Sequence, residues 1–263
     1  MATERGSNLE DYLDKAHGNV TKILKRGGVW IRLVRDIDAA FVHGAETLQS
    51  EPGTVVGAFL IGSHSSWLAA ANLGLAMHVA EACQPLRACL ESACYAYRIR
   101  TDAGAWHRWS RRPTLAHLSS NPAEANARKK LRRDVGREFS VSAITAAFPS
   151  SLAPLQTRIM ALYEELIDFG GHFNFPVVNR AFRATGAADD NYSAELKILF
   201  GGEADQTFCF RKMVETGVVA LEVLDAAIHD QWDSGRIRSA IAATSRALAK
   251  RPKSRLARRR RTT

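Results

Sequence analysis

Two groups of polar side chains in this sequence have the residue types and the spacing of a binding site. Arg87, Glu91 and Tyr95 stand four residues apart, so on a helix all three project from one side. A guanidinium, a carboxylate and a phenol in a row could line a pocket for a polar ligand. An intrahelical ion pair with a tyrosine packed beside it has the same pattern and is the commoner arrangement. Both interpretations stay open.

The second polar group surrounds the end of a later helix, just before and after Gly170-Gly171. Its members are Tyr163, Asp168, His172 and Asn174. Asp168 and His172 are four residues apart, and Asp225 and His229 repeat that spacing, which is compatible with metal ligation. About as many pairs arise by chance, and a metal needs ligands from separate helices. We therefore predict no metal and no cofactor, and look for a site where the helix of Arg87 meets the turn 168–174.

Basic and aromatic residues are concentrated in two segments. The net charge is +9, yet segment 98–137 holds eleven Lys or Arg against three acids, and segment 250–263 holds eight and no acid. Aromatic stacking combined with phosphate neutralisation is typical of nucleic-acid binding, although a solvated helix and a solubilising tail have the same composition. The predicted nucleic-acid contacts are Trp106, Arg108, Trp109, Arg111, Arg132, Arg133, Arg258, Arg259, Arg260 and Arg261.

The longest apolar run at helical spacing, 55–100, is predicted to form two central helices. Small residues crowd its first half, which predicts a helix covered on several sides. Polar residues interrupt it too often for a membrane span. Pro85 predicts that the two helices meet near 82–84, with the proline in the first turn of the second. Further helices are expected at 29–48, 122–139, 151–169, 214–228 and 237–248.

These elements predict an all-α protein, a multi-helix bundle with a small β-hairpin near residues 192–210. Its strands are expected within 192–200 and 207–210. We predict one helical domain over 1–249 and a disordered basic tail over 250–263. The four cysteines form no CxxC pair, which favours buried free thiols in a reducing cytoplasm. The N-terminus has no hydrophobic signal core, so we predict a cytoplasmic protein with no membrane partner.

Two runs also resemble a known family. EACQPLRACLESACYAYRI at 81–99, with LYEELIDFGGHFN at 162–174, resembles a bacterial family of helical proteins described as a domain of unknown function. The resemblance covers about residues 30–230 and says nothing about a reaction. Members look distantly similar to HEPN-like helical bundles, whose ribonucleases pair an arginine with a histidine to polarise an RNA phosphate. The pairs with that spacing are Arg100 with His107, Arg111 with His117 and Arg112 with His117, about as many as chance predicts.

Three functional hypotheses follow. The first is a cytoplasmic helical nucleic-acid-associated binding or accessory protein that contacts RNA or DNA through the basic segment and the tail. The alternatives are a metal-independent HEPN-like ribonuclease and a small-molecule-binding or structural helical module. In the ribonuclease, Arg100 or Arg112 would bind phosphate, and His107 or His117 would act as acid or base. The sequence also leaves open that copies of the same chain associate into a homo-oligomer.

Overall fold

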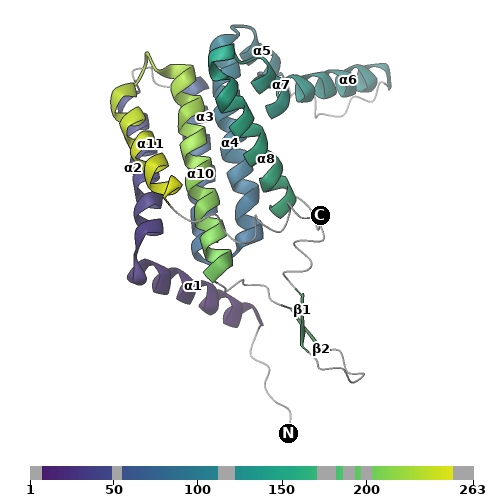
Figure 1. Ribbon diagram of the computed structural model, residues 1–263. Helices are drawn as coiled ribbons and strands as arrows, with labels where there is room; N and C mark the ends of the chain where they lie inside the picture. The colour runs from purple at the N-terminus through teal and green to yellow at the C-terminus, as the bar shows by residue number, and fades with distance from the viewer. Residues whose placement is uncertain are drawn as a thin grey trace, which may run out of the picture.

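A long helix, α10 (Glu203–Ile228), runs through the middle of the molecule and is buried on nearly every side after Met213 (Figure 1). A helix that is apolar all round belongs in the interior of a bundle. In the computed structural model, which describes residues 8–48, 55–111, 122–170, 182–185, 193–196 and 203–250, five helices surround it. They are α2 (Val29–Thr47), α3 (Val55–Leu75), α4 (Val79–Thr101), α8 (Ala153–Gly170) and α11 (Ser234–Ala249).

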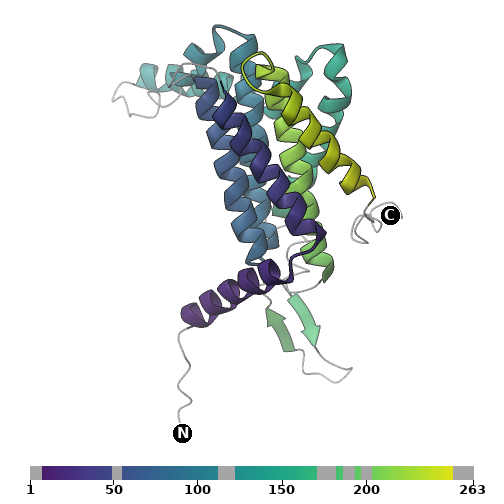
Figure 2. The same ribbon diagram turned by 90° about the vertical axis from the view of Figure 1, so that its left-hand side faces the viewer.

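Shorter elements lie at the two ends of this bundle. α5 (Ala105–Ser110), α7 (Val141–Ala146) and the 3-10 turn η2 (Ser150–Leu152) close one end. α6 (Pro122–Glu138) projects away from that end, and α1 (Asn8–Arg26) runs across the other and extends past it, as the two views show (Figures 1 and 2). The predicted all-α fold is therefore confirmed, and each predicted helix is present within a few residues, except that α10 begins earlier than expected.

The predicted β-hairpin exists, but its position was partly wrong. Strands β1 (Phe182–Thr185) and β2 (Ser193–Leu196) pair antiparallel, with Phe182 opposite Leu196 and Thr185 opposite Ser193. The second expected strand, 207–210, instead forms the start of α10. Phe208 and Phe210 are buried there, so tertiary packing overrides the short alternating pattern that favoured a strand.

The break between α3 and α4 also lies elsewhere than predicted. α3 ends at Leu75, and Met77 adopts a left-handed conformation with φ 72°. The amide of Met77 donates to the carbonyl of Gly74, and that of His78 to Leu73, which is the hydrogen-bond pattern of a Schellman cap. A glycine usually occupies this position, so the sequence carried no visible signal. Pro85 lies inside α4. A proline cannot donate a hydrogen bond to the carbonyl one turn earlier, and here that carbonyl belongs to Glu81, an exposed residue.

α3 is not covered on several sides as expected. One face packs on α4, α10 and α2, while Ile61 is 60% exposed and Leu68 44% exposed on the other. The most enclosed position in the bundle belongs to α10. None of the helices in the described ranges combines the length and apolarity needed to cross a membrane.

The four cysteines are free and buried, as predicted. Three of them lie on α4, where Cys89 is fully buried beside Ser63. Burial raises the pKa of Cys89 and of Cys94 to about 12. At neutral pH these thiols are therefore protonated, and they serve as small apolar side chains in the core.

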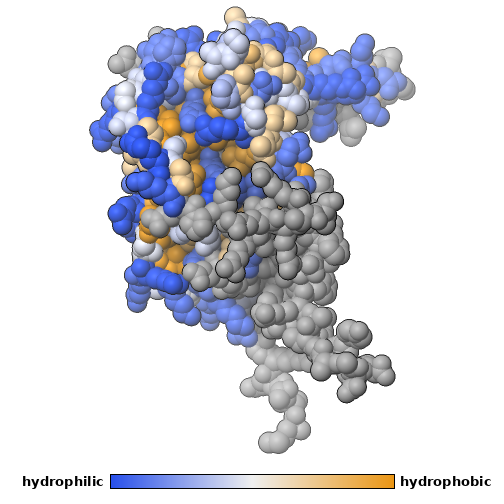
Figure 3. Space-filling model, in the orientation of Figure 1, coloured by the Kyte–Doolittle hydropathy of each residue, from blue (hydrophilic) through white to orange (hydrophobic). Residues whose placement is uncertain are grey.

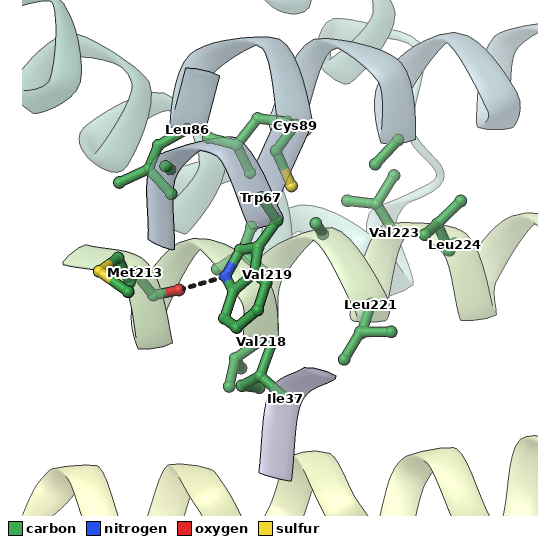
Figure 4. Packing of buried hydrophobic residues seen from close by; sticks show 14 of the residues in the cluster. Ile37, Trp67, Leu86, Cys89, Met213, Val218, Val219, Leu221, Val223 and Leu224 are labelled. Carbon is green, nitrogen blue, oxygen red and sulfur yellow. Dashed lines mark hydrogen bonds between the residues drawn. The ribbon is translucent and has the colours of Figure 1, made fainter. Parts of the chain in front are cut away.

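The core is tightly packed where α2 and α3 meet α10. Trp67 is completely buried, and its indole nitrogen donates to the backbone carbonyl of Met213 at 2.9 Å (Figure 4). Gly217, one helical turn further along α10, makes room for it. A Cβ at Gly217 would lie 2.4 Å from Cγ2 of Ile37 and 3.0 Å from Nε1 of Trp67.

We predict that Gly217→Ala lowers the free energy of unfolding by about 1–3 kcal/mol, because the added methyl overpacks the core. Gly136→Ala is the matched control, since a Cβ at Gly136 meets nothing within 4 Å on α6. It should stabilise by up to about 1 kcal/mol through helix propensity. Urea unfolding followed by circular dichroism measures both. Equal effects of the two substitutions would contradict the packing argument.

Candidate functional site

The predicted group on α4 meets the predicted group on α8 at one point. Tyr163 of α8 donates its hydroxyl to Oε1 of Glu91 at 2.6 Å. Arg87 forms an ion pair with Glu91 at 3.5 Å, and its guanidinium lies 5.3 Å from the centre of the Tyr163 ring. Burial and the Glu91 carboxylate raise the pKa of Tyr163 to about 12. The phenol is thus a hydrogen-bond donor at neutral pH. Glu91 accepts from it and also pairs with Arg87, whose buried Nε has no hydrogen-bond partner among the described residues.

Tyr95 does not join this group, in contrast to the expected row of three. Its ring packs edge-on against Phe59 and Phe139, at 5.9 and 5.7 Å between ring centres. The reason is the helical pitch, because each four-residue step rotates the side chain by about 40° and two steps by about 80°. Tyr95 consequently faces α3 and the end of α6, whereas Arg87 faces α8.

The remaining members of the predicted binding group are Asp168, His172 and Asn174. Asp168 lies in the last turn of α8, whereas His172 and Asn174 lie outside the described residues. In the second Asp–His pair, Asp225 with His229, the aspartate has a structural role. Asp225 is buried and accepts hydrogen bonds from Trp232, Ser234 and Arg238, which fix the turn between α10 and α11.

Arg108, a predicted nucleic-acid contact, belongs to a four-residue charge network with Arg98, Asp102 and Glu138. Its Nε and Nη2 atoms donate to Glu138 at 2.6–3.0 Å, and Nη2 also reaches Asp102 at 2.6 Å. Arg98 contacts both acids, at 3.0 and 3.1 Å. The hydrogen bond from Arg108 holds the pKa of Glu138 below its ordinary value, and likewise that of Asp102. Two cations and two anions balance here, so Arg108 contributes no surplus charge.

This network fixes the direction of α6, because Glu138 is the last residue of that helix. Val135 and Phe139 are buried on either side of it. The rest of α6 between 124 and 134 is almost entirely exposed. Within the described ranges, this polar helix is thus attached to the bundle through its C-terminal end, and Figure 3 shows it as a hydrophilic projection.

The exposed part of α6 carries a continuous basic face. Asn126, Lys129, Lys130, Arg133 and Arg137 fall within an arc of about 100° on a helix with 3.6 residues per turn. Among the residues that the structure describes, no carboxylate forms an ion pair with Lys129, Lys130 or Arg137. An open hollow of about 620 Å³ is lined by Asn126, Lys129, Lys130, Arg132 and Arg133. The arrangement can attract and hold a row of anionic groups.

The other predicted nucleic-acid residues fall into different surroundings. Trp106 is 40% exposed and stacks on Trp109, with 5.6 Å between ring centres and an angle of 22°. Trp109 packs further against Phe59 in the core. Trp106 therefore offers a flat aromatic surface to solvent on a rigid support. Arg111 follows at the exposed end of α5.

The candidate ribonuclease residues are only partly described. Arg100 forms an ion pair with Asp230 at 3.0 Å, and His107 is exposed on α5. Arg112, His117 and the tail residues Arg258, Arg259, Arg260 and Arg261 lie outside the described residues. The ribonuclease hypothesis stays a prediction.

Comparison of this chain with protein-family models, with curated proteins and with solved structures finds no match. The fold and the surface chemistry define the class of protein, an all-α helical bundle with a projecting basic helix.

Of the two contacts predicted on α6, Arg132 and Arg133, only Arg133 belongs to the basic face, and the predicted contacts did not include Lys129, Lys130 and Arg137. The spacing 126, 129, 130, 133, 137 is the signal that would have found them, because it repeats at three and four residues like an apolar stripe. Sequence reasoning also missed Glu138, which stands one residue beyond the basic segment and neutralises part of it.

We predict that Glu138→Gln lowers the free energy of unfolding at neutral pH by about 1–3 kcal/mol through loss of charge-assisted hydrogen bonds. The folded-state pKa of Glu138 lies below its unfolded value, so its contribution is present above the unfolded pKa and is lost as pH falls through the folded pKa. The difference between wild type and variant should therefore shrink under acid conditions.

Glu124→Gln is the matched control for this measurement, because Glu124 also lies on α6 but its side chain is 57% exposed and 3.7 Å from Arg128. It should change the free energy of unfolding by less than about 0.5 kcal/mol. Urea titrations at neutral and acid pH test both variants. A Glu138→Gln deficit that is independent of pH would rule out the charge explanation.

Proposed function

We propose that this protein is a helical nucleic-acid-associated binding or accessory protein that contacts phosphates through α6. The observation that carries the proposal is the exposed basic face of α6, whose Lys129, Lys130 and Arg137 have no carboxylate partner within the described ranges. By contrast, Arg98, Arg100 and Arg108 of this chain are balanced by nearby acids. Cations left unbalanced along one face supply the electrostatic part of nucleic-acid affinity.

The dimensions of the face support a polymer of phosphates rather than a single anion. Asn126 and Arg137 are eleven residues apart, which corresponds to about 16 Å along the helix axis. Several phosphates of one strand fit within that length, since a strand of B-DNA advances about 3.4 Å per nucleotide. A helix held at one end, with solvent around the rest, is also shaped to enter a groove or to lie along a strand.

The exposed ring of Trp106 supports contact with bases in addition to phosphates. Stacking on an aromatic side chain is tolerant of sequence, because every base has a π-face. Trp109 lies behind Trp106 and holds it in place. Both tryptophans precede α6 and are linked to its end through the Arg108–Glu138 hydrogen bonds. The proposed role is therefore to bind nucleic acid with little sequence preference. This role requires neither a reaction nor a metal.

The test is a triple substitution of the α6 face, Lys129→Ala, Lys130→Ala and Arg133→Ala. We expect weaker binding to single- and double-stranded oligonucleotides and a lower salt dependence. Each lost phosphate contact should reduce the slope of log K against log salt by about 0.9 for duplex and about 0.7 for single strands. Fluorescence anisotropy over a salt series measures affinity and slope together.

The matched control removes the same number of charges from α1, as Lys22→Ala, Lys25→Ala and Arg26→Ala. These residues are exposed at the opposite end of the bundle, so net charge falls equally while the α6 face is untouched. If the two triple variants lose affinity equally, binding reflects net charge alone and the proposed face is wrong. Absence of binding by the unsubstituted chain at low salt would remove the proposal altogether.

A further inference from the structure

The outer face of α3 is an uncharged surface, and the proposed nucleic-acid binding leaves it unused. α3 contains no Asp, Glu, Lys or Arg in its 21 residues. Its exposed residues include Ile61 at 60% and Leu68 at 44%, beside Ala58, Ser65, Ala69 and Asn72. Isolated exposed leucines are ordinary, but here two large apolar side chains stand on a helix with no charge to keep it in water.

The spacing along this face is that of a helix that packs against another helix. Positions 58, 61, 65, 68 and 72 alternate steps of three and four residues, which is the pattern of a coiled-coil seam. They lie within an arc of about 120°, together with Gly62 and Ala69. Ser65 stands at the middle of the arc and of the helix. Ile61 and Leu68 form the edge nearer α2, where His64 contacts Asp38. Gly62 and Ala69 form the edge nearer α4, where Gly62 lies close to Ser92.

We propose that this face binds the same face of a second copy of the chain in an antiparallel pair, with the two-fold axis near Ser65. A two-fold axis perpendicular to the helix keeps each edge on its own side. Ile61 then lies beside Leu68 of the second copy, and Gly62 lies beside Ala69 of the second copy. The small edge lets the two backbones approach closely while the large edge supplies apolar burial. The opposed directions also place the two helix dipoles side by side and antiparallel, so that each positive end lies beside a negative end.

The absence of charge on this face favours a second copy of the chain as its partner. In a two-fold interface each residue near the axis faces its own kind, so any charge there would meet a like charge. The α3 face carries none, so two copies of it can meet without bringing like charges together. A membrane surface is a poorer match, because helices that lie on membranes combine large apolar residues with a flanking cationic face. The flank next to His64 is instead the carboxylate of Asp38, whose side chain is 44% exposed.

The pair is expected to be weak and to strengthen with salt. One helix face provides less than the roughly 800 Å² per partner of a standard interface. Each copy also carries a net charge of +9, so the two molecules repel until ions screen them. Raising the ionic strength from about 0.1 M to about 1 M shortens the Debye length from about 10 Å to about 3 Å. Salt thus favours this association, whereas it opposes phosphate binding by α6.

Sedimentation velocity of the full chain, over a concentration series at low and high salt, tests the pairing directly. We expect a monomer–dimer equilibrium that shifts toward dimer with salt. Leu68→Glu should raise the dissociation constant at least about tenfold, since it places two carboxylates in an apolar interface. Leu24→Glu is the matched control, because Leu24 is 42% exposed on α1 and lies off the proposed face. It should leave the equilibrium unchanged.

Ser65→Cys gives a second measurement that can detect the dimer even when its affinity is low. The four native cysteines are buried, so under mild oxidation the new thiol should form an intermolecular disulfide near the axis. Ala161→Cys, exposed on α8, is the control and should cross-link far more slowly. A monomer at every concentration and salt, with equal cross-linking of the two variants, would overturn the proposal. So would binding of the monomer to phosphatidylcholine vesicles that Leu68→Glu abolishes, which would assign the face to a membrane surface.

Discussion

The hydrogen bond from the buried indole of Trp67 to the carbonyl of Met213 is the constraint around which the bundle is arranged. A buried indole N–H costs free energy unless it has an acceptor, and an apolar core offers little besides backbone carbonyls. The carbonyl of Met213 normally accepts from the amide one turn later, that of Gly217. Because Gly217 has no side chain, the indole of α3 and Ile37 of α2 both reach the backbone of α10. Three helices are thereby brought into one close contact.

The elements that the sequence predicted well are those whose signal is local. The periodicity of Val29–Thr47 and of Ala153–Gly170 gave these helices nearly residue for residue, since an apolar stripe reflects one buried face. The turn at Met77 escaped prediction because its left-handed conformation is stabilised by cap hydrogen bonds to Gly74 and Leu73, and a methionine gives no hint of it. Pro85 misled for the converse reason, because a helix tolerates a proline where the carbonyl one turn earlier can reach water.

The candidate site divides in the same way. The Arg87–Glu91 pair follows from four-residue spacing, but its phenol comes from Tyr163 on another helix, and no spacing within α4 can show which tyrosine crosses over. The basic segment is a similar case. Composition showed that cations were abundant, yet Arg98 and Arg108 are neutralised by Asp102 and Glu138. Which cations remain available depends on which acids fold next to them, and that is a property of the tertiary structure.

Repulsion among the cations of α6 lowers the stability of this helix, and an anionic ligand would reduce that repulsion. Lys129 and Arg133, and again Arg133 and Arg137, are four residues apart, a spacing at which like charges destabilise a helix. Apart from Val135 near its attached end, its described side chains bury little, and an isolated helix of this length is marginal in water. Alanine, arginine and lysine have high helix propensity and partly offset the repulsion. Phosphates along the basic face would remove the remaining repulsion, so the proposed anion binding would be thermodynamically linked to helix formation in α6, and each would strengthen the other.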